Sequence, residues 1–222
     1  KDGKFFTGAT PVAGRLSGAA LVKLADTLEA RGAYRLRTTP HQKLVVLDVE
    51  KDQVEPLVAE LDALGLSARP SVFRRGTIAC TGIEYCKLAI VETKHTAATA
   101  ELERRLADLA ESGQLPQALS LHINGCPNSC ARIQTADIGL KGMMLPTPDG
   151  DPSPGFQVHL GGGLANNNRE EAGLGRTVRG LKVYVDDLPD YVERVVRTFV
   201  AQRAEGQTFA EWAHAADEEA LQ

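Results

Sequence analysis

The first seventy residues contain two stretches in which apolar residues recur with the period of an amphipathic helix. Ser17 can cap the first stretch at its start, Gly32 lies where that helix should end, and Gly65 ends the second. The apolar positions are Leu16, Leu21, Leu24, Ala25 and Leu28 in the first stretch and Val54, Leu57, Val58, Leu61 and Leu64 in the second. Between the stretches, residues 33–38 and 44–49 have the pattern of short strands. The order helix, strand, strand, helix predicts a ferredoxin-like half-domain over residues 1–70.

The remaining residues, 71–222, predict a larger lobe in which strands and helices alternate. We expect strands at 77–79, 119–123, 136–140 and 156–160, and helices at 96–112, 188–204 and 208–214. Four prolines and two glycines at 145–155 predict a loop. In the helix at 188–204, Tyr191, Val195, Val196 and Phe199 share an inward face, and Trp212 is expected in the core. The expected fold class is therefore α/β, of the α+β kind.

Composition and charge narrow the possible functions. The chain has 222 residues, 43% of them apolar, and a net charge of −4, which argues against a nucleic-acid partner. No apolar run approaches the roughly 18 residues of a membrane span, so we expect no membrane partner. The start, at Lys1 without a methionine, has no signal-peptide pattern and is what a fragment of a longer protein would show.

Four cysteines form two close pairs, Cys80 with Cys86 and Cys126 with Cys130. Without an export signal we expect a cytoplasmic protein, where thiols are kept reduced and serve as metal ligands more often than as disulfides. Four thiolates suit a [4Fe–4S] cluster. A four-cysteine zinc site fits the C-x3-C pair but fits the C-x5-C pair poorly, and four unrelated buried cysteines are a further alternative.

The residues around these cysteines resemble those of the siroheme-dependent sulfite and nitrite reductase family. The two motifs are Cys80-Thr-Gly-Ile-Glu-Tyr-Cys86 and Asn124-Gly-Cys126-Pro-Asn-Ser-Cys130-Ala-Arg132. Ala136-Asp-Ile-Gly-Leu-Lys-Gly142 and His159-Leu-Gly-Gly162 continue the resemblance in the family's order, and Arg37-Thr-Thr-Pro-His-Gln42 precedes it. The resemblance covers residues 12–209 and is nearest to the C-terminal half of actinobacterial-type ferredoxin-dependent sulfite reductases.

The resemblance implies two cofactors, a [4Fe–4S] cluster held by Cys80, Cys86, Cys126 and Cys130, and a siroheme. It makes Cys130 the thiolate shared by the cluster and the siroheme iron. The implied reaction is the six-electron reduction of sulfite to sulfide with ferredoxin as electron donor, and nitrite reduction to ammonia is the alternative within the family. The N-terminal half of the same enzyme is the implied partner, which would supply the anion-binding Arg and Lys residues. From another class of protein, a zinc or electron-transfer module without catalysis is the competing hypothesis.

Siroheme carries many carboxylates, so its pocket needs cations and hydrogen-bond donors. The candidate contacts are Arg37, Thr39, Gln42, Asn128, Arg132, Gly161, Gly162 and Arg176. Each has a structural alternative. The arginines can face solvent or support the fold, Thr39 and Gln42 can cap their turn, and the glycines can form an ordinary turn at a strand end. His122 and His159 are expected to be packed strand histidines.

Overall fold

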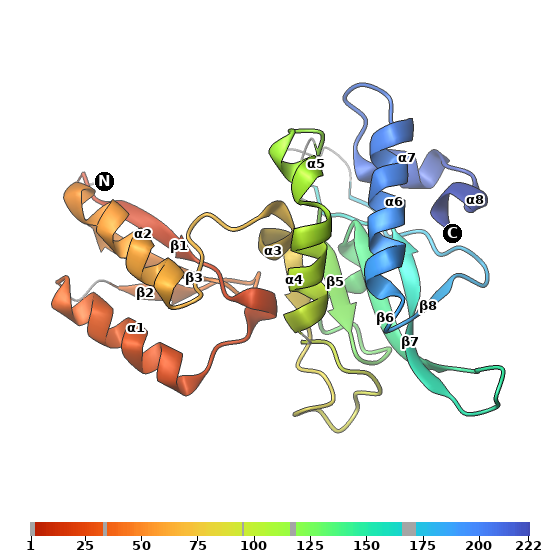
Figure 1. Ribbon diagram of the computed structural model, residues 1–222, viewed down its shortest axis with the longest axis horizontal. Coiled ribbons are helices and arrows are strands. Elements are labelled where there is room, and N and C mark those ends of the chain that lie inside the picture. Colours follow the sequence, from red (N-terminus) through yellow and green to blue (C-terminus); the bar gives the residue numbers. More distant parts are fainter. Residues whose placement is uncertain (1–2, 33–34, 95, 116–118, 166–171) are drawn as a thin grey trace.

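In a computed structural model the chain forms two units joined side by side (Figure 1). The structure describes residues 3–32, 35–94, 96–115, 119–165 and 172–222. The first unit contains β1 (Phe5–Ala9), α1 (Gly18–Ala30), β2 (Leu36–Thr38), β3 (Leu44–Val49) and α2 (Val54–Ala63). Its antiparallel sheet has the order β1-β3-β2, and the buried faces of both helices pack on it around Leu24, Val46 and Leu57. The Ser17 side chain accepts a hydrogen bond from the backbone N–H of Ala20, which confirms it as the cap of α1.

The second unit is built on a five-stranded sheet with the order β4-β5-β6-β7-β8. The strands are β4 (Thr77–Ala79), β5 (Leu121–Asn124), β6 (Ile138–Leu145), β7 (Ser153–Leu160) and β8 (Lys182–Tyr184). The first three are parallel to one another, and β7 and β8 are antiparallel to their neighbours. Two helices, α4 (Thr96–Arg105) and α6 (Leu188–Gln202), lie in front of this sheet in Figure 1. The mixed α/β architecture confirms the expected fold class.

Several boundaries differ from the sequence-based expectations. The loop expected at 145–155 is shorter in the structure and covers residues 146–152, because β6 runs to Leu145 and β7 begins at its partner Ser153. Pro154 lies near the start of β7, and its carbonyl accepts a hydrogen bond from the N–H of Val185. The helix expected at 96–112 is interrupted at Leu106 and resumes as α5 (Ala107–Glu111). The apolar pattern did not predict β1, β8, α3 (Val72–Gly76) or α8 (Glu218–Leu221), and residues 33–34 of one expected strand lie outside the described residues.

The core of the second unit lies between the sheet and α6. Tyr191, Val195, Val196 and Phe199 are buried on the inner face of α6, as the sequence predicted. The Phe199 ring lies 5.2 Å from that of Phe209 on α7 (Phe209–Ala215), and both rings lie 5.5 Å from Trp212. Among the described residues, no helix is both long and apolar enough to cross a membrane.

One residue of the first seventy lies in the core of the second unit. Ala13, in a short 3-10 turn at Val12–Gly14, belongs to the first seventy residues but packs into the hydrophobic core of the second unit. The proposed boundary after residue 70 therefore separates the two sheets but cuts through one packed core.

Candidate metal centre

The sheet of the second unit has one apolar and one polar face, because consecutive strand residues point in opposite directions. The pairing register aligns Ile123, Leu140 and Val158 across β5, β6 and β7, and all three belong to the hydrophobic core. The alternate positions are polar or small, and the register aligns them in two rows, His122 with Gly139 and His159, and Asn124 with Lys141 and Gln157. The cysteine motifs follow β4 and β5 at their carboxyl ends.

Parallel pairing of β4 and β5 brings the first cysteine of each motif to the same edge of the sheet. Cys80 follows directly after β4, and its N–H donates to the carbonyl of Ile123 on β5 at 2.9 Å. The N–H of Gly125, one residue before Cys126, donates to the Cys80 Sγ at 3.2 Å. A Cβ on Gly125 would lie 2.7 Å from the carbonyl oxygen of Val91, so only glycine allows this approach. The two motifs therefore meet at Gly125.

The segment that carries Cys86 is attached to the same point. The N–H groups of Ile90 and Val91 both donate to the Gly125 carbonyl, at 2.7 and 3.2 Å, and the Cys86 N–H donates to the Gly82 carbonyl at 3.0 Å. Around Cys86 the chain leaves several large apolar side chains open to solvent, with Tyr85 75% and Leu88 66% exposed. This stretch, residues 83–90, is called the cysteine segment. It has exposed apolar side chains, and backbone hydrogen bonds at its end attach it to Gly125.

Asn124 holds the second motif in its bend. This completely buried side chain donates to the carbonyl of Cys126 at 2.9 Å and accepts from the N–H of Ala131 at 2.7 Å. These two bonds join both ends of the loop, in which Cys126 is buried and Cys130 is exposed. Ser129 and Arg132 adopt left-handed backbone conformations that turn the chain around Cys130.

All four cysteines are free thiols, and the N–H···S hydrogen bond to Cys80 fits a cluster loop. A single zinc ion needs each ligand sulfur about 2.3 Å from one point. In a [4Fe–4S] cluster each thiolate binds its own iron, so the four sulfurs lie further apart, and N–H···S bonds such as that of Gly125 are typical of cluster loops.

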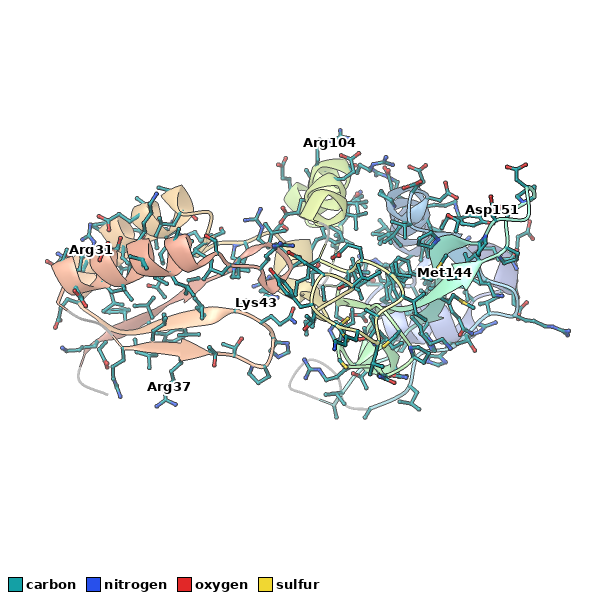
Figure 2. The ribbon with its side chains drawn as sticks, turned by 90° about the horizontal axis from the view of Figure 1, so that it is seen from below. Arg31, Arg37, Lys43, Arg104, Met144 and Asp151 are labelled. Atoms are coloured by element: carbon teal, nitrogen blue, oxygen red, sulfur yellow. The ribbon has the colours of Figure 1, made fainter. Side chains whose placement is uncertain are left out.

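The predicted siroheme contacts of the first unit lie in and beside the turn after β2. Figure 2 shows Arg37 pointing away from the outer side of the three-stranded sheet, where it is exposed. The Thr39 hydroxyl accepts from the N–H groups of His41 and Lys43 at 3.3 and 3.2 Å, which supports the turn-cap alternative. The Gln42 amide bonds with both backbone groups of Ala79, directly before Cys80.

Among the contacts predicted near Cys130, Asn128 is exposed and Arg132 is half-buried. The Arg132 guanidinium donates to the Pro40 carbonyl at 3.1 Å, which places the turn of the first unit beside the second cysteine motif. His122 lies below this loop, with its Nδ1 3.1 Å from the carbonyl oxygen of Arg132. Burial lowers the pKa of His122 to about 4, so the ring is neutral and donates from Nδ1. The packed role expected for His122 agrees with these contacts. The described structure gives no partner to the buried Nε2 of His159.

Gly161, Gly162 and Arg176 lie at the end of β7. A Cβ on Gly162 would lie 2.2 Å from the Gln134 carbonyl oxygen, so this glycine permits close packing on the segment that follows Cys130. Gly161 donates from its N–H to the Asp137 carbonyl at 2.7 Å. The Arg176 guanidinium donates to the carbonyls of Ala213 and Ala216 at 3.2 and 2.8 Å, at the C-terminal end of α7. These bonds support the structural alternative for Arg176.

Two lysines near the first motif were missed by the sequence analysis. The Lys43 Nζ is buried and donates to the Thr77 carbonyl at 2.6 Å, and the Lys94 Nζ donates to the carbonyls of Ala13 and Ala79 at 2.9 and 3.1 Å. Burial, and to a smaller extent Lys94, lower the pKa of Lys43 to about 8. Figure 2 places Lys43 at the junction of the two units. No local sequence signal marks either lysine, because their partners are 15 to 81 residues away.

The half-domain has both helices on one face of its sheet, and in the lobe that follows two cysteine loops meet at a sheet edge. This arrangement agrees with the class expected from the cysteine motifs, that of siroheme and iron–sulfur reductases. The family model of the "Nitrite and sulphite reductase 4Fe-4S domain" matches residues 73–221. The family model of the "Nitrite/Sulfite reductase ferredoxin-like half domain" matches residues 1–64. The chain belongs to the nitrite and sulphite reductase family, whose members carry a [4Fe–4S] cluster and a siroheme.

The individual relatives agree with this assignment. The chain is 53% identical, over its whole length, to "Sulfite reductase [ferredoxin] 1" of Mycolicibacterium paratuberculosis, of which it covers 39%. It is 34% identical, over 99% of its length, to the "Assimilatory ferredoxin-dependent nitrite reductase" of Haloferax mediterranei, of which it covers 36%. The solved structure of the Mycobacterium tuberculosis NirA protein superimposes with a TM-score of 0.94 at 49% identity, over all of this chain and 40% of that one. The chain thus spans about two fifths of the length of these relatives.

Proposed function

We propose that this chain is the cofactor-binding C-terminal half of an assimilatory, ferredoxin-dependent sulfite reductase of the cytoplasm. The observation that carries the proposal is the meeting of the two cysteine loops at Gly125, where the N–H of Gly125 donates to Cys80 Sγ. The higher identity to the sulfite reductases than to the nitrite reductase supports sulfite as the substrate, with nitrite as the second candidate.

Within this proposal, Cys80, Cys86 and Cys126 bind the cluster, and Cys130 is shared with the siroheme. The burial of Cys126 and the exposure of Cys130 support this division, because a thiolate that reaches a second group has to lie at the edge of its loop. When bound, the cluster would supply single electrons from ferredoxin, and the siroheme would supply the iron at which the anion is reduced. Arg132, two residues after Cys130, would bind a siroheme carboxylate.

An N-terminal half of the same enzyme would complete the site. Its support is the exposed apolar surface of the cysteine segment, which comprises Ile83, Tyr85, Leu88 and Ile90. Apolar groups of this size gather at a surface that another part of a protein covers. We expect that half to supply the cationic groups that bind the anion.

The test is metal and sulfide analysis of the full-length enzyme after anaerobic purification, with assays of both anions. About four irons with matching sulfide are expected, and Cys80→Ser, Cys86→Ser and Cys126→Ser should each remove or strongly reduce them. Stoichiometric zinc without iron would show instead a structural four-cysteine site. A higher kcat/KM for nitrite than for sulfite, with reduced ferredoxin as donor, would replace sulfite by nitrite as the substrate.

A further inference from the structure

The carboxyl end of β4, where Cys80 begins the first motif, is held by two consecutive side chains from a distant segment. Thr93 is buried, and its hydroxyl donates to the Cys80 carbonyl at 2.7 Å and lies 3.8 Å from the Cys80 Sγ. Lys94 donates from its Nζ to the carbonyl of Ala79, directly before Cys80, at 3.1 Å. The dipeptide 93–94 thus contacts the chain on both sides of the Cys80 nitrogen.

The same ammonium group connects the two units. Its second hydrogen bond, of 2.9 Å, goes to the carbonyl of Ala13 in the turn that packs into the core of the second unit. Because two carbonyl oxygens from different parts of the chain bind one half-buried Nζ, the positive charge of Lys94 is fixed in position. Burial lowers the pKa of Lys94, and the thiolate of Cys80 acts on it in the opposite direction.

Charged groups of both signs lie near Lys94. Arg15 and Glu84 form an ion pair at 2.6 Å, and Lys43 adds a second buried ammonium at the Thr77 carbonyl. The Glu92 carboxylate accepts from the N–H of Thr93 at 2.9 Å and from the N–H of Lys94 at 2.8 Å. With Lys94 included, three cations and two carboxylates lie beside the first motif.

A fixed cation near a redox centre stabilises the form that has gained an electron, and the effect is larger where protein replaces water. We propose that Lys94 is a positioning residue that raises the reduction potential of the cluster bound through Cys80. It does so by holding an ammonium group against the carbonyl end of the strand that delivers this cysteine. The proposal rests on the cluster assignment of the proposed function.

The experiment is a redox titration of the cluster, followed by EPR, in the full-length enzyme and its variants. Lys94→Met should lower the midpoint potential by an amount that corresponds to about a tenfold change in the reduction equilibrium, or about 59 mV for one electron. Lys94→Arg keeps the charge and should stay near the wild type. Lys182→Met, at an exposed lysine of β8, is the matched control and should leave the potential unchanged.

Iron and sulfide analysis is done on every sample, so that two kinds of failure are separated. A wild-type enzyme without iron and sulfide would refute the cluster assignment itself. Full iron content with an unchanged potential in Lys94→Met would overturn the role of Lys94, and so would an equal shift in Lys94→Arg. If Lys94→Met does not retain the cluster, Lys94→Gln replaces it, because the amide can still donate to the Ala79 carbonyl without a charge. An unchanged potential in that variant would equally overturn the proposal.

Discussion

The carboxamide of Gln42 pairs with the backbone of Ala79 through two hydrogen bonds, although the residues are 37 positions apart. The Ala79 N–H donates to Oε1 at 3.0 Å, and Nε2 donates to the Ala79 carbonyl at 2.6 Å. Gln42 therefore occupies the free edge of β4 as a neighbouring strand would, and it attaches the turn of the half-domain to the strand that leads into Cys80. The backbone of Gln42 is left-handed, with a φ of 59°, which directs the side chain across the junction.

We expect Gln42→Ala to loosen this junction and to lower the retention of iron at the first motif. The loss of two hydrogen bonds at a half-buried edge costs about 1–3 kcal/mol. The measurement is the rate of iron release to a chelator from the full-length enzyme, with the exposed Lys51→Ala as control. Equal release rates in the two variants would show that Gln42 does not support the cluster strand.

Replacement of Cys130 by serine should separate the two cofactors, because an alkoxide or hydroxyl is a poor bridge between a cluster and a haem iron. The expected result is the loss of exchange coupling in Mössbauer or EPR spectra, or the failure of siroheme to assemble. Lys182→Ala, at an exposed site on β8, should do neither. Unaltered coupling and full turnover in Cys130→Ser would remove Cys130 from the bridging role.

His122 should make the second unit less stable in acid. Its pKa is about 4 in the folded chain and near 6.5 when unfolded, so between these values the unfolded state binds the extra proton. The contribution of the neutral ring to the free energy of unfolding is therefore fully present above pH 6.5. It decreases by up to about 3 kcal/mol as the pH falls towards 4.

The urea midpoint, followed by the fluorescence of Trp212, should decrease between pH 7 and pH 5 more in the wild type than in His122→Gln. Trp212 is the single tryptophan of this chain and lies in the same unit as His122. The same pH dependence in both proteins would contradict the assignment of a neutral buried imidazole.

Residues 1–222 expressed alone should bind little siroheme and should not reduce sulfite. Cys130 and the apolar side chains of the cysteine segment are exposed in this chain, so the cofactor would have no cover on that side. The assay is sulfide release with reduced methyl viologen or ferredoxin after cofactor reconstitution, and addition of the N-terminal half should restore binding and turnover. Turnover by the 222 residues alone, at a rate comparable with the full-length enzyme, would disprove the half-site interpretation.

The amino-acid sequence by itself determined the features that depend on near neighbours along the chain. The helical periods around Leu24, Leu57 and Val195 fall on buried faces, because the period of an apolar pattern decides which side of a helix can be buried. The two cysteine motifs and their order placed the chain in its family, which the comparisons confirm. The roles of the individual cysteines and of the siroheme contacts stay predictions.

Only the tertiary structure decided how these pieces act on one another. The pairing of β6 with β7 through a proline-rich segment, the bonds of Gln42 and Lys94 to Ala79, and the position of Arg176 at the end of α7 all join residues far apart in the chain. Such contacts leave no periodic trace in the sequence, because a side chain that serves a distant carbonyl or strand edge has no preferred spacing from it. The cysteines could be recognised from their local motifs, whereas the charges and amides that surround them became visible only when the two units had packed together.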